Sequence, residues 1–306
     1  MRRIVGIVLL ALGAFLIVLA PLVRFQIAGS LIAAPAAQYG VNKLEAEGAQ
    51  YFSIKDLRVM TAKLGVTVTV RGDVAQAKDD TVVWDEFTAV NDETNGNPGI
   101  TLTERRSAFN KYSGEGVTCC SVNIDKKPVT LEGQIYKWPF DVEKKTYKVF
   151  NSVTGKAFDA RFVGEEHVNG VLAYRFEQDV PETRTETRNV PASILGITDT
   201  TGDVQADRYH TGKNTFWVEP VTGSPLKQEQ QRDEVLRTPD GAHSITALRA
   251  TFRMTPETVN TLVNNAVESK NQISLIKVTI PLVLLVLGIV LLAAGFFVAR
   301  GAHARA

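Results

Sequence analysis

Two long runs without a charged residue are the strongest constraint on how this chain can fold. One run covers residues 4–23, between Arg3 and Arg24, and the other covers residues 278–299, between Lys277 and Arg300. The hydrocarbon core of a bilayer is about 30 Å thick, and about 20 helical residues cross it. Each run can therefore span a membrane, which excludes a freely soluble protein as long as both runs are retained.

The first run has an alternative interpretation as a cleaved signal peptide, because the small residues at 34–36 resemble a peptidase site. However, the apolar part of a signal peptide has about 7–15 residues, and here the run is longer and the small residues lie well beyond its end. We therefore expect an uncleaved membrane helix. Pairing of the two runs is only weakly indicated, because Gly288 and Gly295 are seven residues apart and neither run contains GxxxG.

The charges that flank the two runs predict their orientation. Arg2, Arg3, Arg300 and Arg305 make both chain ends positive, and neither end carries an acid. Positive flanks stay in the cytoplasm, so we expect a two-pass protein of the cell membrane with both termini cytoplasmic. The predicted segments are a cytoplasmic tail (1–3), a transmembrane helix (4–23), an extracytoplasmic β-rich domain (24–254), a stalk helix (255–277), a second transmembrane helix (278–299) and a second cytoplasmic tail (300–306).

The part between the runs is slightly acidic. Without the six basic residues that flank the runs, 28 basic residues stand against all 33 acidic ones, a net charge of −5. Binding to nucleic acid needs a concentrated basic face, so we expect no nucleic-acid partner. No metal-binding, nucleotide-binding or catalytic motif occurs, so we expect neither an enzyme nor a cofactor or metal. We expect His210 to be solvated, next to a turn.

The central part shows the alternation of apolar and polar residues that is typical of β-strands. The clearest examples are residues 66–71, 100–103 and 248–254. Dipeptides that suit tight turns separate such stretches. They are Asn95-Gly96, Thr154-Gly155, Asn169-Gly170, Thr222-Gly223 and Asp240-Gly241. The sequence therefore predicts a mainly antiparallel β fold, a twisted sheet or barrel-like domain, with one transmembrane helix at each end.

One helix is predicted inside the central part. Thr255 is a capping residue, Pro256 suits the first helical position, and apolar residues follow at helical spacing from Val259 to Val267. We interpret this helix as a stalk that leads into the second run. A weaker helical signal lies at residues 41–48.

Three segments of the sequence resemble the actinobacterial PorA family of porin-named envelope proteins. They are IYKWPFDVEKKTYKVFN (135–151), VNGVLAYRFE (168–177) and FWVEPVTGSPLK (216–227). The resemblance covers nearly the whole chain and implies a two-span membrane protein with a β-rich domain outside the cell membrane. A transmembrane barrel needs about eight or more strands with continuous apolar faces. Charge interrupts these strands, as at residues 182–188, so we do not expect one chain alone to form a pore.

Cys119 and Cys120 are adjacent, and the chain has no other cysteine. In an oxidising compartment they can bond to each other, bridge to another chain or remain free thiols. Adjacent Cα atoms lie about 3.8 Å apart, below the lower end of about 4.4 Å for unstrained disulfides. We favour a vicinal disulfide that acts as a rigid turn, with a redox switch as the alternative.

Three aromatic residues are candidates for lining an apolar cavity. Trp138, Phe140 and Trp217 lie in apolar contexts. Buried aromatic side chains usually belong to a core, and the alternative is that they surround an acyl chain.

Our first hypothesis is that the protein binds or transfers a hydrophobic, lipid-like component of the cell envelope. One alternative is an accessory or sensor subunit of an envelope complex, which would bind a membrane protein partner. The other is an oligomeric pore. All three place the chain in a lipid bilayer.

Overall fold

The structure, a computed structural model, describes residues 2–301. Arg305 and the rest of the predicted C-terminal tail beyond residue 301 lie outside the described residues. The chain forms two compact units, of which the first is Met1–Ala33 with Val267–Ala306 and the second is Ala34–Ala266.

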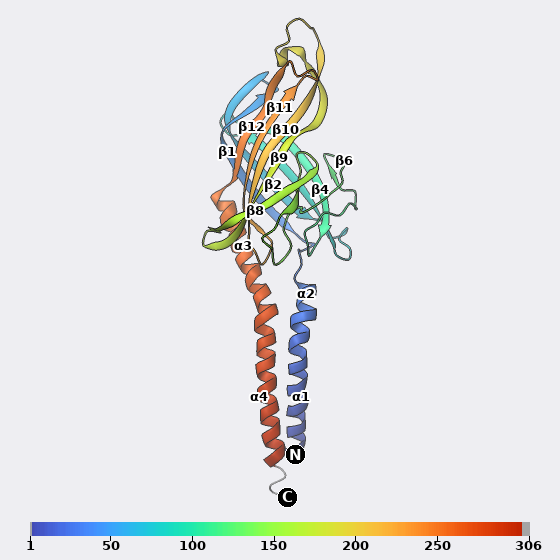
Figure 1. Cartoon of the computed structure of the whole chain (residues 1–306), viewed down its shortest axis with the longest axis vertical. Coiled ribbons are helices and arrows are strands. Elements are labelled where there is room, and N and C mark those ends of the chain that lie inside the picture. Colours follow the sequence, from blue (N-terminus) through green and yellow to red (C-terminus); the bar gives the residue numbers. More distant parts are fainter. Residues whose placement is uncertain (1, 302–306) are drawn as a thin grey trace. The chain divides into compact units, whose positions relative to one another are not determined.

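The first unit is helical. Its elements are α1 (Arg2–Leu22), the π-helical segment η1 (Val23–Ile27), α2 (Ala28–Leu31), the part of α3 (Pro256–Ser274) from Val267 onward, the π-helical segment η3 (Leu275–Thr279) and α4 (Ile280–Gly301). Two helical stretches, Arg3–Leu31 and Pro256–Arg300, are long and apolar enough to cross a membrane. Helices α1 and α4 lie side by side and antiparallel, as Figure 1 shows.

Glycines bring the backbones of α1 and α4 into close contact. A Cβ atom added to Gly13 would lie 2.8 Å from the carbonyl oxygen of Gly288, and one added to Gly295 would lie 2.9 Å from that of Gly6. Such distances are too short for a side chain, so only glycine permits this approach. The weak pairing signal in the sequence is therefore an underestimate, because the contacting glycines repeat every seven residues and do not form GxxxG.

The second unit is built on one antiparallel sheet of twelve strands. The strands are β1 (Tyr39–Ser53), β2 (Arg58–Gly72), β3 (Thr81–Asp92), β4 (Asn97–Asn110), β5 (Asn123–Ile124), β6 (Lys127–Pro128), β7 (Tyr147–Asn151), β8 (Lys156–Val168), β9 (Val171–Pro191), β10 (Asp203–Val218), β11 (Pro225–Arg237) and β12 (Ser244–Met254), with a short 3₁₀ helix η2 (Ala192–Leu195). Their order in the sheet is β6-β5-β4-β3-β2-β1-β12-β11-β10-β9-β8-β7. The predicted β fold with an apolar helix at each end is confirmed.

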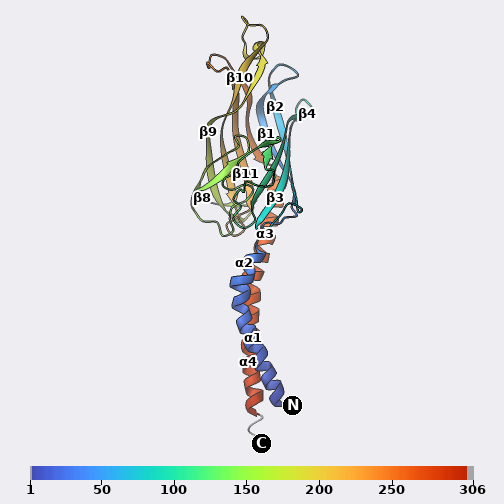
Figure 2. The same ribbon diagram turned by 90° about the vertical axis from the view of Figure 1, so that its right-hand side faces the viewer.

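The sheet is bent into a half-barrel, which Figure 2 shows from the side. At one end of the half-barrel, the segment between β4 and β7 connects the two edges of the sheet. Gln134 makes this connection, because its N–H donates to the carbonyl of Lys148 at 2.8 Å and its carbonyl accepts from the N–H of Phe150 at 2.9 Å. The neighbouring Gly133 carbonyl accepts from the N–H of Gly116 at 2.8 Å, which ties this segment back to the β4 side.

The inner face of the sheet, defined here as the face that bears Leu64, Leu248 and Phe252, carries most of the core. The outer face of β8–β11 is covered by the first half of α3, where Val259 and Val263 pack with Trp217 and Leu226. The predicted cap of α3 is present, since the Oγ1 of Thr255 accepts from the N–H of Thr258 at 3.3 Å.

The predicted turns lie where the sequence placed them, and one predicted helix does not exist. All five turn dipeptides fall between consecutive strands. The helical signal at residues 41–48 is wrong, because these residues belong to β1. They contain good helix formers, but pairing with β2 and β12 outweighs that preference, and Gly48 takes a φ of +62° where the register shifts between Ala46 and Ala49.

Candidate functional site

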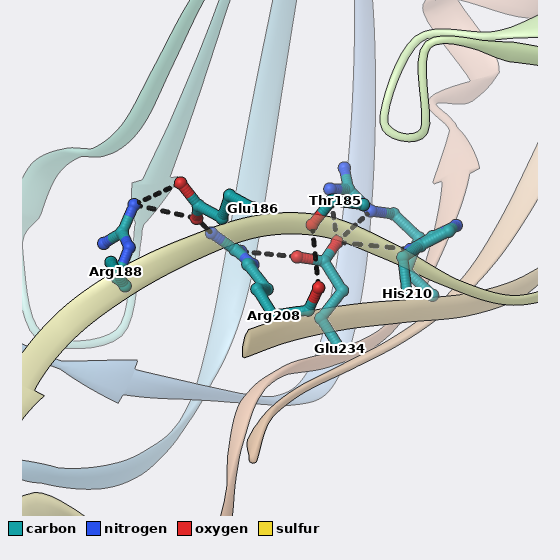
Figure 3. A network of polar contacts seen from close by, with 7 residues as sticks. Thr185, Glu186, Arg188, Arg208, His210 and Glu234 are labelled. Carbon is teal, nitrogen blue, oxygen red and sulfur yellow. Dashed lines mark hydrogen bonds and ion pairs between the residues drawn. The ribbon is translucent and has the colours of Figure 1, made fainter. Parts of the chain in front are cut away.

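A cluster of charged side chains lies on the inner face of β9, β10 and β11 (Figure 3). We call it the arginine–glutamate cluster. It comprises Glu186, Arg188, Arg208, His210, Arg232 and Glu234. Register fixes the face: His210 lies opposite Glu234, which lies opposite Leu248 of the core. Residues that are directly paired across strands point to the same side of a sheet.

Glu234 is the centre of the cluster and is only 1% exposed. One carboxylate oxygen, Oε1, accepts from Nε of Arg232 at 3.0 Å and lies 3.5 Å from Nδ1 of His210. The other, Oε2, accepts from Nη2 of Arg208. A buried carboxylate is tolerated when opposite charges and hydrogen bonds compensate it, and here two guanidinium groups do so.

Arg208 connects this buried centre to the edge of β9. Its Nη1 donates to Oε1 of Glu186 at 3.3 Å. Glu186 in turn accepts from Nη2 of Arg188, at 2.7 Å and 2.8 Å for its two oxygens. Arg188 is exposed. The cluster therefore extends from a buried centre at Glu234 to a solvent-exposed edge at Arg188. It contains three arginines and two glutamates, an excess of one positive charge before His210 is counted.

The cluster keeps its carboxylates ionised. Burial alone would raise the pKa of Glu234, but the charges of Arg232 and Arg208 and the contact with His210 hold that pKa well below its usual range. Burial also raises the pKa of Glu186, but the hydrogen bond from Arg188 lowers it, and the net result is a lowered pKa. Arg208 correspondingly has a raised pKa despite its burial. At neutral pH Glu234, Glu186 and Arg208 are therefore charged.

Gly212 makes room for the cluster. A Cβ atom at this position would lie 2.5 Å from the carbonyl oxygen of Gln231 and 3.2 Å from Nε2 of His210. Any other residue would push His210 toward Glu234 or part β10 from β11. The absence of a side chain at Gly212 therefore leaves room for the imidazole of His210 on the inner face of the sheet.

The cluster lies beside an unpaired part of the sheet. Within the described residues, β9 pairs with β8 only as far as Gln178, so residues 179–191 have a strand partner on one side alone. On the other side of the opening, residues 97–103 of β4 pair with β3 alone. We call the opening between these two edges the seam.

Apolar side chains that are only half-buried lie on the inner face near the seam. Val204 and Ile245 pack around Ala206 and Leu236, in rows next to Arg208. Met60 and Ile100 pack at the margin of the core cluster of β1–β3 and β12. A charged group thus lies next to apolar surface that the chain does not fully cover.

The structure separates the three predicted aromatic residues. Trp138 is buried on the inner face, 5.5 Å from Phe176 and 5.1 Å from Phe216 between ring centroids. Trp217 follows Phe216 in β10, so its side chain points to the outer face of the sheet. There its Nε1 donates to Glu166 at 2.7 Å, and its ring packs beneath α3. Phe140 is half-buried, with Nζ of Lys137 3.6 Å from its ring centre. The three side chains do not form one site, and a lining role for any of them stays a prediction.

Cys119 and Cys120 are joined to each other in the structure. They lie in the segment between β4 and β5 and pack against the core cluster that contains Trp84 and Phe109. The carbonyl of Cys120 accepts from Nε of Arg106 at 3.0 Å. Cys120 and the next residue, Ser121, both have left-handed backbones, with φ of +58° and +59°. The redox state in the cell stays a prediction.

Sequence reasoning missed the arginine–glutamate cluster. It placed His210 in solvent beside a turn, which is wrong, because His210 is 2% exposed in the middle of β10. The available signal was the two-residue spacing of Arg208 and His210 and of Arg232 and Glu234, which puts each pair on one face of its strand. Among the described residues, no group of three or more His, Cys, Asp or Glu is placed to hold a metal ion.

Several polar side chains of the inner face are buried at the level of the cluster. Gln178, His210 and Glu234 are almost fully buried, and Asn214 donates to Gln178 at 2.8 Å. The described strands form an open sheet with β6 and β7 as its edge strands, which differs from the closed barrel of a porin.

The fold defines a membrane protein with a half-barrel sheet and with one apolar helix before it and one after it in the sequence. The chain belongs to the PorA family: the family model described as Porin PorA matches residues 5–297. Two relatives are Porin PorA of Corynebacterium amycolatum, 32% identical over 126 residues, and Porin PorA of Corynebacterium resistens, 26% identical over 142 residues. The first match covers 32% of this chain and 32% of the relative, and the second covers 31% and 34%. The chain thus spans about a third of the length of the curated relatives it matches. Family membership and the two apolar helices indicate a membrane location.

Proposed function

We propose that this protein is a non-catalytic envelope protein that binds an amphiphilic molecule on the inner face of its half-barrel. The acyl chain would lie along the seam, and the polar head would contact Arg188 and Arg208. The observation that carries the proposal is the unpaired seam itself, because it leaves apolar side chains of the inner face half-covered beside a charged cluster.

The chemistry of the cluster favours an anionic head group. Three arginines face two glutamates, and guanidinium groups hold phosphate and carboxylate oxygens through paired hydrogen bonds. Arg188 is at the edge and partly exposed, so it can turn from Glu186 toward a ligand without disturbing the buried centre at Glu234. Arg208 would supply the second positive charge from inside.

We also propose that the chain crosses the cell membrane twice, with both termini in the cytoplasm and the sheet outside. The antiparallel contact of α1 with α4 supports this topology, because it brings the N-terminal end of α1 and the C-terminal end of α4 to the same end of the helix pair. The exposed apolar side chains of both helices suit contact with lipid.

Native mass spectrometry of the full chain, extracted in mild detergent, tests the binding proposal. Wild type should retain an anionic amphiphile, and Arg188→Gln should retain less of it. The matched control is Arg184→Gln, because Arg184 lies on the same strand but is paired with Asp207, toward the other face. Equal retention by the two variants, or no retained amphiphile on wild type, would contradict the proposal.

An oligomeric pore is the second candidate, and the name of the two relatives is the observation that favours it. Because the sheet of one chain is open and does not close into a barrel, such a pore would have to form between several chains. Single-channel recording in planar bilayers tests it: stepwise conductance that scales with the oligomer would support a pore, and a silent bilayer with confirmed insertion would exclude it.

A further inference from the structure

The last residues of the β1–β2 hairpin have no strand partner outside the hairpin. Pairing of β1 with β12 ends at Tyr51, and pairing of β2 with β3 reaches only to Leu64. Within the described residues, β1 and β2 continue past these points paired only with each other, to Ser53 opposite Arg58. We call residues 52–60 the finger. It lies at the end of the second unit away from the start of α3 (Figure 2).

The tip of the finger exposes large apolar side chains. Ile54 is 76% exposed and Leu57 is 61% exposed. Just below them, Val59 is exposed and lies opposite Phe52. Leu57 also has a left-handed backbone, with φ of +50°, a conformation that costs free energy for any residue with a Cβ atom.

Local folding does not require apolar residues here. Two other hairpin turns at the same end, residues 93–96 and 238–243, contain no large aliphatic or aromatic hydrophobic residue and place Gly96 and Gly241 in the left-handed position. The finger instead places leucine where glycine or asparagine would be favoured. Exposed apolar side chains in a strained turn indicate contact with something apolar outside the chain.

The charges of the finger indicate what that contact is. Lys55 and Arg58 are exposed, and in the described part of the chain neither has a carboxylate within ion-pair distance. The one acid of the tip is turned away, because Asp56 accepts from Oγ of Ser53 at 2.6 Å while its own N–H donates to the same oxygen at 3.2 Å. The tip of the finger thus presents Ile54 and Leu57 together with two basic side chains.

We propose that the finger inserts its tip into the surface of an anionic lipid bilayer. Apolar side chains enter the acyl boundary while flanking Lys and Arg remain at the head groups, which is the pattern of membrane-surface anchors. Within the second unit, the finger lies far from both points where the chain joins the helical unit. The chain enters and leaves the second unit at the opposite end of the sheet, and from Lys43, beside the start of α3, to Ser53 the strand extends about 33 Å. This contact goes beyond the proposed amphiphile site and does not depend on it.

Vesicle flotation tests the proposal with the full chain in phosphatidylcholine nanodiscs. The vesicles are either pure phosphatidylcholine or a mixture of phosphatidylcholine and phosphatidylglycerol. Wild type should float with the anionic vesicles. Ile54→Asn with Leu57→Asn should reduce binding about tenfold or more, because two apolar side chains no longer leave water. Lys55→Gln and Arg58→Gln should each reduce it about fivefold, and only on anionic vesicles.

The matched control is Val74→Asn, because Val74 is 58% exposed in the turn between β2 and β3, at the other end of the sheet. This variant should bind as wild type does. Asparagine accepts a left-handed backbone, so the finger variant should also fold, which tryptophan fluorescence during unfolding checks. Equal binding by the finger variant and the control would overturn the proposal. Failure of wild type to bind either kind of vesicle would also overturn the proposal. It would indicate that the finger contacts a protein and not a lipid surface.

Discussion

Replacing Glu234 by glutamine removes the negative charge at the centre of the arginine–glutamate cluster and leaves its shape almost unchanged. Loss of one partner from a buried ion pair costs about 3–5 kcal/mol, because the remaining charge stays buried without compensation. Here Arg208 keeps its contact with Glu186 and Arg232 is partly exposed, so we expect the lower end, about 3 kcal/mol. For a domain of this size the melting temperature should fall by about 6–12 °C.

Intrinsic fluorescence measures this effect without a label. All three tryptophans, Trp84, Trp138 and Trp217, are buried in the second unit, so denaturant or thermal unfolding of the full chain in detergent reports on the sheet. The matched control is Glu182→Gln, whose carboxylate pairs with Arg237 at 2.9 Å near the surface. An exposed pair contributes less than about 1 kcal/mol, so this variant should unfold almost as wild type does.

The pH dependence gives a second readout. The pKa of Glu234 is lowered in the folded chain, and that of an unfolded glutamate is about 4.3. The stabilisation is therefore complete above about pH 5 and is lost as the pH falls through the folded pKa. Wild type should lose stability below pH 5 more steeply than Glu234→Gln does. Equal stabilities for Glu234→Gln and Glu182→Gln at pH 7 would refute the reasoning about this cluster.

Three other features give predictions that can be checked in the same preparations. Gly13→Val should separate α1 from α4 and lower the thermal stability of the helix pair in detergent. The control Gly29→Val should leave that stability unchanged, because Gly29 has open space around it. Equal stabilities of the two variants would disprove the close contact. Burial lowers the pKa of Lys137 to about 7, so the folded chain binds fewer protons there than the unfolded chain, and stability should rise from pH 7 to pH 9; the rise should be smaller in Lys137→Met, and an identical rise would count against the buried amine. Protein purified without reductant should be lighter than the reduced protein by two hydrogen atoms, because Cys119 is bonded to Cys120; mass spectrometry that finds two free thiols would contradict this.

The sequence was sufficient to predict the class of fold. Apolar alternation and Gly-containing turns mark strands locally, and a charge-free run marks an apolar helix locally, so neither needs knowledge of distant contacts. Residues 41–48 show the limit of this approach. Their composition favours a helix, but their partners in β2 and β12 are distant in sequence, and only tertiary pairing makes them a strand.

The arginine–glutamate cluster could not be predicted in the same way. Its members come from three strands, and register shifts lie beside it, between Arg208 and Tyr209 and between Glu234 and Val235. A shift of one residue moves a side chain to the opposite face of the sheet. Spacing along β10 and β11 shows which residues share a face, but it does not show that His210 lies opposite Glu234 or that this face is buried.

The glycine contacts of the helix pair are a third case. The seven-residue spacing of Gly288 and Gly295 is visible in the sequence, but its meaning depends on the direction of the partner. Gly6 and Gly13 match it only because α1 and α4 are antiparallel. A search for GxxxG, which describes a different crossing geometry, does not detect this arrangement.

Photo-crosslinking with an anionic lipid that carries a photoreactive acyl chain would locate bound lipid on the full-length protein in nanodiscs. We expect adducts on peptides of the inner face beside the seam, above all those that contain Ile100, Val204 and Ile245, and we expect Arg188→Gln to reduce them. Adducts confined to α1 and α4, with none on the sheet, would contradict binding of an amphiphile by the half-barrel.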